Sequence, residues 1–436
     1  MPNFASTKLL LEVVANQKQG MPKGIYSICS ANPYVIQESL RFSQDHQQWV
    51  LIESTSNQVN QDGGYTGMAP GDFAAYISDM AQKQGVSKDQ ILLGGDHLGP
   101  NPWKAQAADK AMEKAGVLVR EYIRAGYRKI HLDTSMKCGD DAPEKPLDLA
   151  VEAKRAAELC AIAEETWLSQ KDNHAPLYVI GTEVPVPGGV ESDDESIQIT
   201  TPQSVLESLD VYEQTFNALG LNEAWKRVIA VVVQPGVEFS QFHIHDYDPS
   251  KAAALSQCIE SVPGIIFEAH STDYQKPNAL RQMVADHFAI LKVGPALTLA
   301  LREAVFALAH IEKELLGIQN HSKLSLIQEI LDQVMVENPQ HWQSYYHGKQ
   351  QELAIARKYS YSDRIRYYWP DQRVSDALSI LIRNLNLTII PLVLIKQFLP
   401  NQYERIREGK IRSDPESLIL DSIRLVLNDY LYACQN

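Results

Sequence analysis

Cysteine is scarce in this sequence of 436 residues. The five cysteines are odd in number and lack the short spacings of a metal-binding module: Cys29, Cys138, Cys160, Cys258 and Cys434. This pattern argues against a disulfide framework and favours reduced thiols in a cytoplasm.

Long apolar runs are also lacking. Near the N-terminus, the short apolar stretch at residues 9–14 is interrupted by Glu12, whereas a membrane span needs about 20 apolar residues. We therefore expect neither a signal peptide nor a membrane-spanning helix. No segment is low in complexity, and no linker is long enough to separate independent domains.

Positive charge is in deficit, because 40 Lys and Arg face 54 Asp and Glu, which gives a net charge of −14. The two signs are interspersed, and a nucleic-acid partner would need a concentrated positive surface. The glycine-rich segment 63–67 lacks the lysine of a nucleotide P-loop. We therefore expect no nucleic acid, no nucleotide and no NAD.

Eight short apolar runs, most of them ending in polar residues, are what the sequence does contain. Such runs are typical of strands buried on both faces of a parallel sheet. Helical stretches separate most of them, and Thr201-Pro202 supplies a helix N-cap with proline at the first helical position. This alternation predicts a TIM (β/α)8 barrel. The runs are residues 24–30, 49–54, 92–100, 129–135, 178–183, 229–234, 265–270 and 289–294.

The chain is long for one barrel of roughly 250 residues, so an appendage is expected. We assign residues 1–310 to the barrel and residues 311–436 to a helical C-terminal extension packed on it. Within the extension, the segment 359–369 is rich in residue types favoured at interfaces. It packs the extension on the barrel, forms a partner surface, or lies as a flap over the mouth.

Asp96 and His97 are the strongest candidates for chemistry, since they end a buried strand and a Gly-Pro pair follows. Strand ends in a barrel meet at its catalytic face, where an imidazole can bind a divalent cation while the adjacent acid moves a proton. The structural alternative is that Asp96 caps the next helix and His97 donates to a backbone carbonyl. Glycines around the pair favour the functional interpretation.

Metal ligands beyond His97 come from other strand ends. His270 is the best second ligand, and Glu183 is a candidate third ligand or a catalytic acid or base. The alternatives for the third position are Glu238 or the pair His243 and His245. The ion would be Zn, Mn, Ni or Co.

Four further mouth residues suit substrate binding. Asp133 and Ser135 are suited to recognising hydroxyl groups, and Gln234 ends the sixth strand. Lys292 would stabilise an oxyanion or form a Schiff base. Its acidic neighbours would raise its pKa, which disfavours the Schiff base.

Several long motifs in this order closely resemble the GatZ/KbaZ (AgaZ) family. They are residues 51–61, 63–68, 94–101, 181–189, 234–239, 267–275, 291–298 and 361–370. The resemblance runs almost end to end and implies a TIM barrel. It also implies an accessory subunit that supports a separate catalytic class II D-tagatose-1,6-bisphosphate aldolase in galactitol or N-acetylgalactosamine catabolism.

A more distant resemblance links the chain to catalytic class II aldolases. It implies that Asp96 is a proton donor and His97 a metal ligand, with matches at Asp133-x-Ser135 and at Glu183 before Gly188-Gly189. The match fails at three places. Gln234 stands in the region of a second histidine ligand, Ser271 to Asp273 replace a glycine-rich phosphate loop, and Gly294 replaces an asparagine.

These departures disfavour a phosphorylated substrate, because Asp273 places a negative charge where the phosphate would bind. Two hypotheses follow. The chain is an accessory aldolase subunit, or it is a metal-dependent ketohexose C4 epimerase that acts on unphosphorylated fructose or tagatose by retro-aldol cleavage and re-addition. In the second case, Asp96 or Glu183 moves the proton.

Overall fold

The computed structural model describes residues 7–170, 174–181, 197–317 and 324–435. Within these ranges, eight parallel strands close into a barrel with the order β1-β10-β9-β6-β5-β4-β3-β2. Each strand overlaps one of the predicted apolar runs, so the predicted barrel is confirmed. The strands are β1 (Ile25–Ile28), β2 (Val50–Thr55), β3 (Ile91–Leu98), β4 (Lys129–Leu132), β5 (Leu177–Gly181), β6 (Val228–Val233), β9 (Ile266–Ala269) and β10 (Phe288–Val293).

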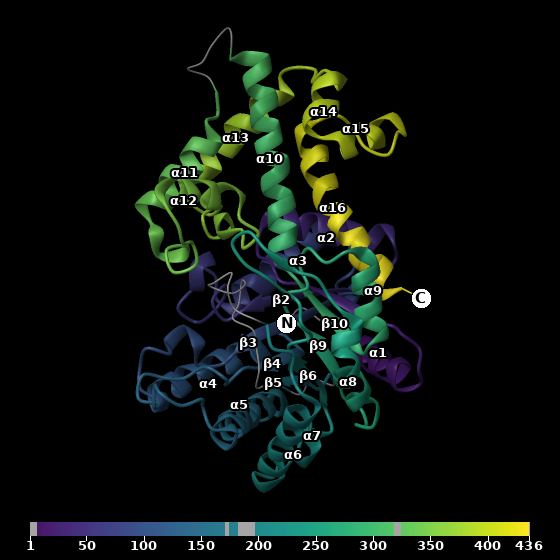
Figure 1. Cartoon of the computed structure of the whole chain (residues 1–436), viewed down its shortest axis with the longest axis vertical. Helices are drawn as coiled ribbons and strands as arrows, with labels where there is room; N and C mark the ends of the chain where they lie inside the picture. Colours follow the sequence, from purple (N-terminus) through teal and green to yellow (C-terminus); the bar gives the residue numbers. More distant parts are fainter. Residues whose placement is uncertain (1–6, 171–173, 182–196, 318–323, 436) are drawn as a thin grey trace.

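Helices surround this barrel (Figure 1). They are α1 (Lys8–Lys18), α2 (Pro33–Asp45), α3 (Pro70–Gln84), α4 (Ala108–Arg124), α5 (Leu149–Ser169), α6 (Pro202–Ala218), α7 (Asn222–Trp225), α8 (Pro249–Glu260), α9 (Pro277–Ala285) and α10 (Pro295–Leu316). A small antiparallel hairpin, β7 (Glu238–Phe239) and β8 (Ile244–His245), follows β6.

Local sequence fixes where several of these helices begin. Asn32, Thr201 and Asp248 each precede a proline, and each side chain accepts a hydrogen bond from a backbone amide two or three residues further on. The caps satisfy amides that the first helical turn leaves unpaired, and the prolines fix φ at the helix start.

Helix α1 closes the amino-terminal end of the barrel. Its buried side chains Leu10, Val13 and Val14 form one cluster with residues of the strands, among them Ile25 and Leu51. Apolar packing therefore excludes water from this end. Polar side chains are left to gather at the opposite end, where the strands finish.

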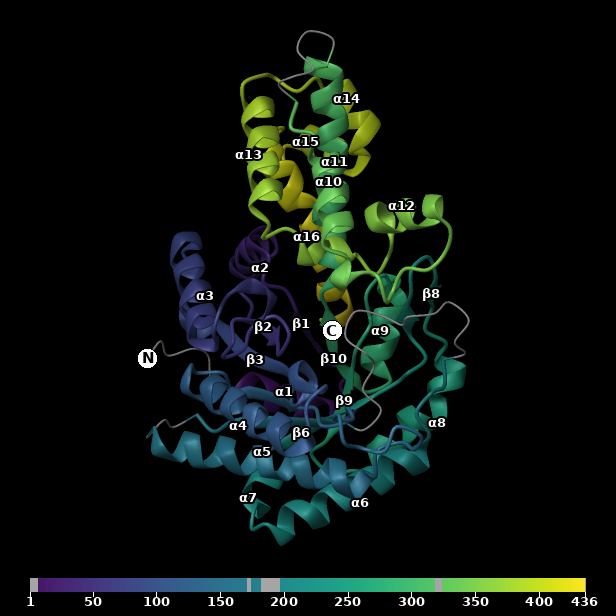
Figure 2. The same cartoon turned by 90° about the vertical axis from the view of Figure 1, so that its left-hand side faces the viewer.

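The extension consists of helices that rise from the barrel (Figure 2). Helix α10 leaves the barrel and runs through residue 310 without a break, so the division at 310/311 remains a prediction. The last helix, α16, returns and packs between α9 and α2, closing the outer ring. The helices are α11 (Ile327–Glu337), α12 (Gln350–Tyr359), α13 (Gln372–Asn386), α14 (Leu392–Phe398), α15 (Pro400–Arg407) and α16 (Pro415–Cys434).

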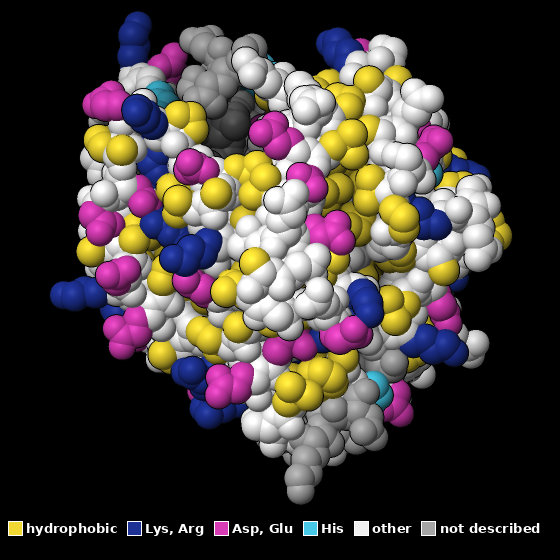
Figure 3. Space-filling model, turned by 90° about the horizontal axis from the view of Figure 1, so that it is seen from below, with side chains coloured by type: hydrophobic (Ala, Val, Ile, Leu, Met, Phe, Trp, Pro, Cys, Tyr) yellow, Lys and Arg dark blue, Asp and Glu magenta, His cyan; other side chains and the backbone are white. Residues whose placement is uncertain are grey.

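Surface properties agree with the composition. On the face seen from below, acidic, basic and hydrophobic side chains are interspersed (Figure 3). Among the described helices, none has the length and apolarity needed to cross a membrane. All five cysteines carry free thiols.

Candidate active site

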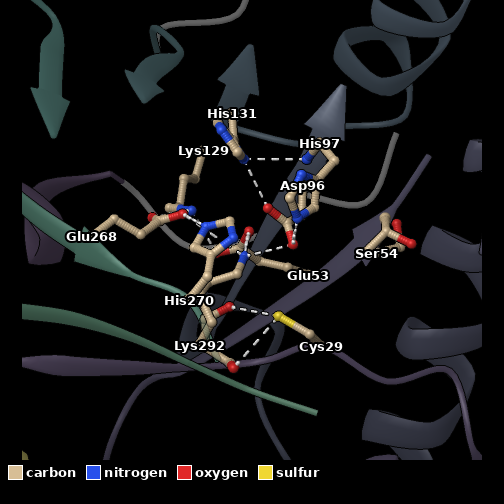
Figure 4. Close-up of polar contacts among 12 residues, drawn as sticks. Cys29, Glu53, Ser54, Asp96, His97, Lys129, His131, Glu268, His270 and Lys292 are labelled. Atoms are coloured by element: carbon tan, nitrogen blue, oxygen red, sulfur yellow. Dashed lines mark hydrogen bonds and ion pairs between the residues drawn. The ribbon is translucent and has the colours of Figure 1, made fainter. Parts of the chain in front are cut away.

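Ionisable side chains from several strands meet inside the carboxyl end of the barrel (Figure 4). All of them are buried. They are Glu53 on β2, Asp96 and His97 on β3, Lys129 and His131 on β4, Glu268 on β9, His270 just after β9, and Lys292 on β10.

Glycines allow these groups to approach so closely. A Cβ on Gly94 would lie 2.6 Å from Cγ of Glu53, and a Cβ on Gly99 would lie 1.7 Å from the carbonyl oxygen of Asp133. His97 itself has φ 50°, a left-handed conformation that is uncommon for a residue with a side chain. Glycine therefore shapes this strand end, as the sequence predicts.

Two buried lysines bind the acids together. Nζ of Lys292 lies 2.5 Å from Glu53 Oε2 and 3.0 Å from Asp96 Oδ2. Nζ of Lys129 lies 2.7 Å from Glu53 Oε1 and 2.6 Å from Glu268 Oε2. Burial alone would lower both lysine pKa values, but the surrounding carboxylates outweigh it and raise them. Both lysines are therefore ammonium ions at neutral pH.

The carboxylates are held ionised by the same network. Burial opposes ionisation of Asp96, yet His97 and Lys292 hold its pKa well below the usual value. Likewise, Lys129 and Lys292 overcome burial to lower the pKa of Glu268. A carboxyl group must be ionised to bind a metal ion or to accept a proton.

Each histidine has its own acidic partner. His131 Nδ1 lies 2.9 Å from Asp96 Oδ1, and His270 Nε2 lies 3.0 Å from Glu268 Oε1. Burial lowers the pKa of His270 to about 4, so its imidazole is neutral at pH 7.

His97 differs, because its Nδ1 lies 2.8 Å from Asp133 Oδ2. Burial disfavours its charge, but Asp96 and Asp133 outweigh that effect and raise its pKa. Asp133 is in turn fixed by Ser135, whose hydroxyl donates to Oδ1 at 2.6 Å. Asp133 and Ser135 therefore orient His97.

Four of these residues form a group suited to a metal ion. Ligand atoms of Asp96, His131, Glu268 and His270 all lie within 4.8 Å of one another. Nitrogen and carboxylate oxygen donors suit Zn²⁺ and its first-row neighbours. His131 Nε2 is buried and has no hydrogen-bond partner among the described residues, as a nitrogen reserved for a ligand would be.

Charge balance also fits a divalent cation. Among the described residues, the carboxylates buried here are those of Glu53, Asp96, Asp133 and Glu268, and the buried ammonium groups are those of Lys129 and Lys292. Protonated His97 can balance one of the two excess negative charges. A bound cation would offset the remainder, which is otherwise costly in a buried site.

The sequence-predicted residues fall into three sets. Asp96, His97, Asp133, His270 and Lys292 come together. Gln234 is engaged locally, since its Oε1 accepts from the Gly236 amide at 2.8 Å. Glu183 lies outside the described residues, so its predicted role stays a prediction, as does ligation by His97.

Residues that the sequence analysis missed complete the site: Glu53, Lys129, His131 and Glu268. In β4, Lys129 and His131 alternate with Ile130 and Leu132, and a period of two inside an otherwise apolar run was the available signal. In the described residues, Glu238, His243 and His245 do not belong to the metal-suited group.

Asp273 occupies an anion-binding position. Its Oδ1 accepts hydrogen bonds from the backbone amides of Gly294 at 3.0 Å and Ala296 at 2.8 Å, at the amino end of α10. A helix amino end is a natural seat for a phosphate. Here the chain's own carboxylate fills it, and burial raises the pKa of that carboxyl to about 6.

The extension supplies part of the mouth. The segment 359–369 packs against α10, since the Asp363 carboxylate accepts from Thr298 Oγ1 at 2.7 Å and from Arg302 Nε at 3.0 Å. Arg366 and Tyr367 then line a cavity that opens to solvent, together with Asp96, His97, His270 and Lys292. This segment therefore both packs against α10 and lines the mouth of the barrel.

Three solved structures resemble this chain to different degrees. A crystal structure of a probable tagatose 6 phosphate kinase from Sinorhizobium meliloti 1021 is 44% identical, with a TM-score of 0.86 over 94% of this chain and 100% of that one. The YdjI aldolase of Escherichia coli K12 is 10% identical, with a TM-score of 0.43 over 84% of this chain and 96% of that one. A fructose-bisphosphate aldolase from Campylobacter jejuni is 12% identical, with a TM-score of 0.46 over 88% and 94%.

The model of the family described as "D-tagatose-1,6-bisphosphate aldolase subunit GatZ/KbaZ-like" matches residues 10–435, nearly the whole chain. This confirms the resemblance that the sequence motifs indicated. The chain belongs to the GatZ/KbaZ-like family of D-tagatose-1,6-bisphosphate aldolase subunits.

Proposed function

We propose that this chain is an accessory subunit that supports the activity and stability of a catalytic class II D-tagatose-1,6-bisphosphate aldolase. The pathway would be the catabolism of galactitol or N-acetylgalactosamine through tagatose 6-phosphate, in the cytoplasm. One observation supports the proposal most directly: the Asp273 carboxylate accepts hydrogen bonds from the backbone amides at the start of α10.

Electrostatic repulsion supports this proposal. A sugar bisphosphate needs amide donors or cations for each phosphate. With Asp273 ionised at neutral pH, a phosphate dianion would find these amides already occupied. Repulsion between the two negative charges would also cost ~1 kcal/mol at 4 Å in water and more when desolvated. Cleavage of the bisphosphate therefore falls to a partner with an open phosphate site.

The test is to add the purified chain to a purified catalytic class II aldolase and to measure turnover and the half-life at elevated temperature. Bovine serum albumin at the same concentration controls for nonspecific protection. We expect the full chain to raise turnover, half-life or both. No change in either, at concentrations where both proteins are folded, would contradict the accessory role.

A second function is favoured by the intact group of acids and imidazoles. It is C4 epimerisation of an unphosphorylated ketohexose, such as conversion between fructose and tagatose by retro-aldol cleavage and re-addition. A divalent cation, when bound by His131, Glu268 and His270, would stabilise negative charge on the sugar's ketone and enediolate oxygens.

The chain's own residues would then move the proton. Asp96 lies beside the cavity, and its carboxylate can take the proton of the C4 hydroxyl as the C3–C4 bond breaks. Lys292 holds that carboxylate in place at 3.0 Å. Re-addition to the other face of the aldehyde returns the proton and inverts C4. Glu183 is the alternative acid or base.

The chain alone is incubated with D-fructose or D-tagatose and with Mn, Ni, Co or Zn, and the sugars are separated by chromatography. We expect conversion by the wild type and by His310→Gln, a control at an exposed histidine on α10. Asp96→Asn should convert the sugars at least ~100-fold more slowly than the wild type. Conversion that is unchanged in Asp96→Asn eliminates this site.

A further inference from the structure

Arg366 has no acidic partner within ion-pair distance among the described residues. Its Nη1 donates to the carbonyl oxygens of Ser362 and Asp363, and its Nη2 donates to Tyr367 Oη at 3.1 Å. Its Nε has no protein partner in the described part of the chain. The guanidinium is thus held in place by neutral groups, with donors to spare.

The nearest acids are engaged elsewhere. Asp363 turns its carboxylate to Thr298 and Arg302, and Asp273 turns its Oδ1 to the amides at the start of α10. Both carboxylates still attract Arg366 at longer range, but neither pairs with it directly, so its forked donors stay open to an anionic ligand.

Arg366 also faces the site. It lines the same cavity as Asp96, His97 and Lys292, on the side formed by the extension. Tyr65, from the 3-10 turn Gly64–Thr66, packs edge-on against Tyr367 with ring centroids 4.7 Å apart and lines the cavity too. This brings the glycine-rich segment 63–67 to the mouth, with phenol groups beside the guanidinium.

We propose that Arg366, with Tyr65 and Tyr367, forms a subsite for a carboxylate at the end of the sugar remote from the acid and imidazole group, so that the ligand is a ketose acid such as a hexuluronate. A planar carboxylate matches the fork of an arginine. A phosphate dianion fits less well because it carries about twice the charge of a carboxylate and is repelled more strongly by the Asp273 carboxylate, which lines the same cavity. The proposal rests on the sugar-binding function proposed above.

Binding is measured by isothermal titration calorimetry on the full chain, without a partner and without turnover. The probes are D-fructose, D-fructuronate and D-fructose 6-phosphate, which share a carbon skeleton and differ at C6. We expect D-fructuronate to bind at least tenfold more tightly than D-fructose, and D-fructose 6-phosphate to bind more weakly than D-fructuronate.

The variants separate a binding role from a structural one. Arg366→Gln should abolish the preference for D-fructuronate and leave the Kd of D-fructose within twofold, whereas a merely structural role would weaken both sugars alike. Arg366→Lys, which keeps the charge but loses the fork, should retain part of the preference. Arg412→Gln removes a charge at a side chain that is 85% exposed and should change nothing.

The inference is overturned by equal binding of D-fructose and D-fructuronate, by a preference that survives in Arg366→Gln, or by tighter binding of the 6-phosphate. The absence of binding by all three probes overturns it as well. The absence of all binding counts against the sugar-binding function too, whereas binding of D-fructose without a preference for D-fructuronate overturns the subsite alone, so the two failures are distinguishable.

Discussion

Lys292 Nζ lies 3.0 Å from Asp96 Oδ2 and so ties β10 to β3 past the two strands that separate them in the barrel. The same ammonium reaches Glu53 on β2 at 2.5 Å. The consequence is mutual: the acids keep the lysine charged, and the lysine keeps Asp96 ionised.

A charged Lys292 predicts that no Schiff base forms with a ketose. Full-length protein is incubated with D-tagatose and sodium borohydride, and its intact mass is measured. We expect no added mass, because an ammonium ion is not a nucleophile. A lysine-dependent aldolase treated in parallel with its own ketose substrate provides the positive control. Mass added to the peptide that carries Lys292 would refute this role for the lysine.

Removal of Lys129 should be strongly destabilising. Lys129→Met leaves Glu53 and Glu268 buried without this cation, and the expected loss is about 3–5 kcal/mol in the free energy of unfolding. Urea unfolding at pH 7 measures it. Lys129→Met with Glu268→Gln should recover part of the loss, since one uncompensated charge is gone.

The matched control is Lys251→Met, at an exposed lysine on α8, which should change stability by less than about 0.5 kcal/mol. Equal effects of the two single substitutions would show that the ion pairs of Lys129 contribute nothing.

Asp273 predicts a pH dependence of stability. Burial raises the pKa of its carboxyl from 3.8 to about 6, so between pH 4 and 6 the folded chain holds a proton that the unfolded chain has lost. This carboxyl therefore lowers the free energy of unfolding as pH rises through that window, by roughly 2–3 kcal/mol in total.

Asp273→Asn should remove this dependence, because asparagine does not titrate and its Oδ1 can still accept from both amides. In urea unfolding at pH 4.5, 5.5 and 7.0, the free energy of unfolding of the variant should increase relative to that of the wild type as pH rises. A difference that stays constant with pH would contradict the shifted pKa.

The barrel could be predicted because burial on both faces makes each strand a short apolar run, a signal written locally in the sequence. The residues at the ends of these runs, such as Asp96 and His270, could be predicted for the same reason. The place of Glu53 and Lys129 in the site could not be predicted, because it depends on the register that brings β2, β4 and β9 together across the barrel.

Two contacts of the mouth were also beyond local patterns. The sequence indicated that Asp273 opposes a phosphate, but the hydrogen bonds that it accepts from Gly294 and Ala296 depend on the packing of the loop after β9 against the start of α10. Arg366 reaches the cavity only because Asp363 anchors its segment on α10, far away in the sequence.

The central claim is that the acids and imidazoles at the barrel mouth bind a divalent cation, and the metal content of purified protein tests it most directly. Wild type and His131→Gln are loaded with Zn²⁺ or Mn²⁺, dialysed, and analysed by inductively coupled plasma mass spectrometry, with circular dichroism to check folding. We predict about one equivalent of metal in the wild type and in the exposed-site control His310→Gln, and a large loss in His131→Gln. A wild type that retains no metal, or a folded His131→Gln that retains as much, would contradict the account.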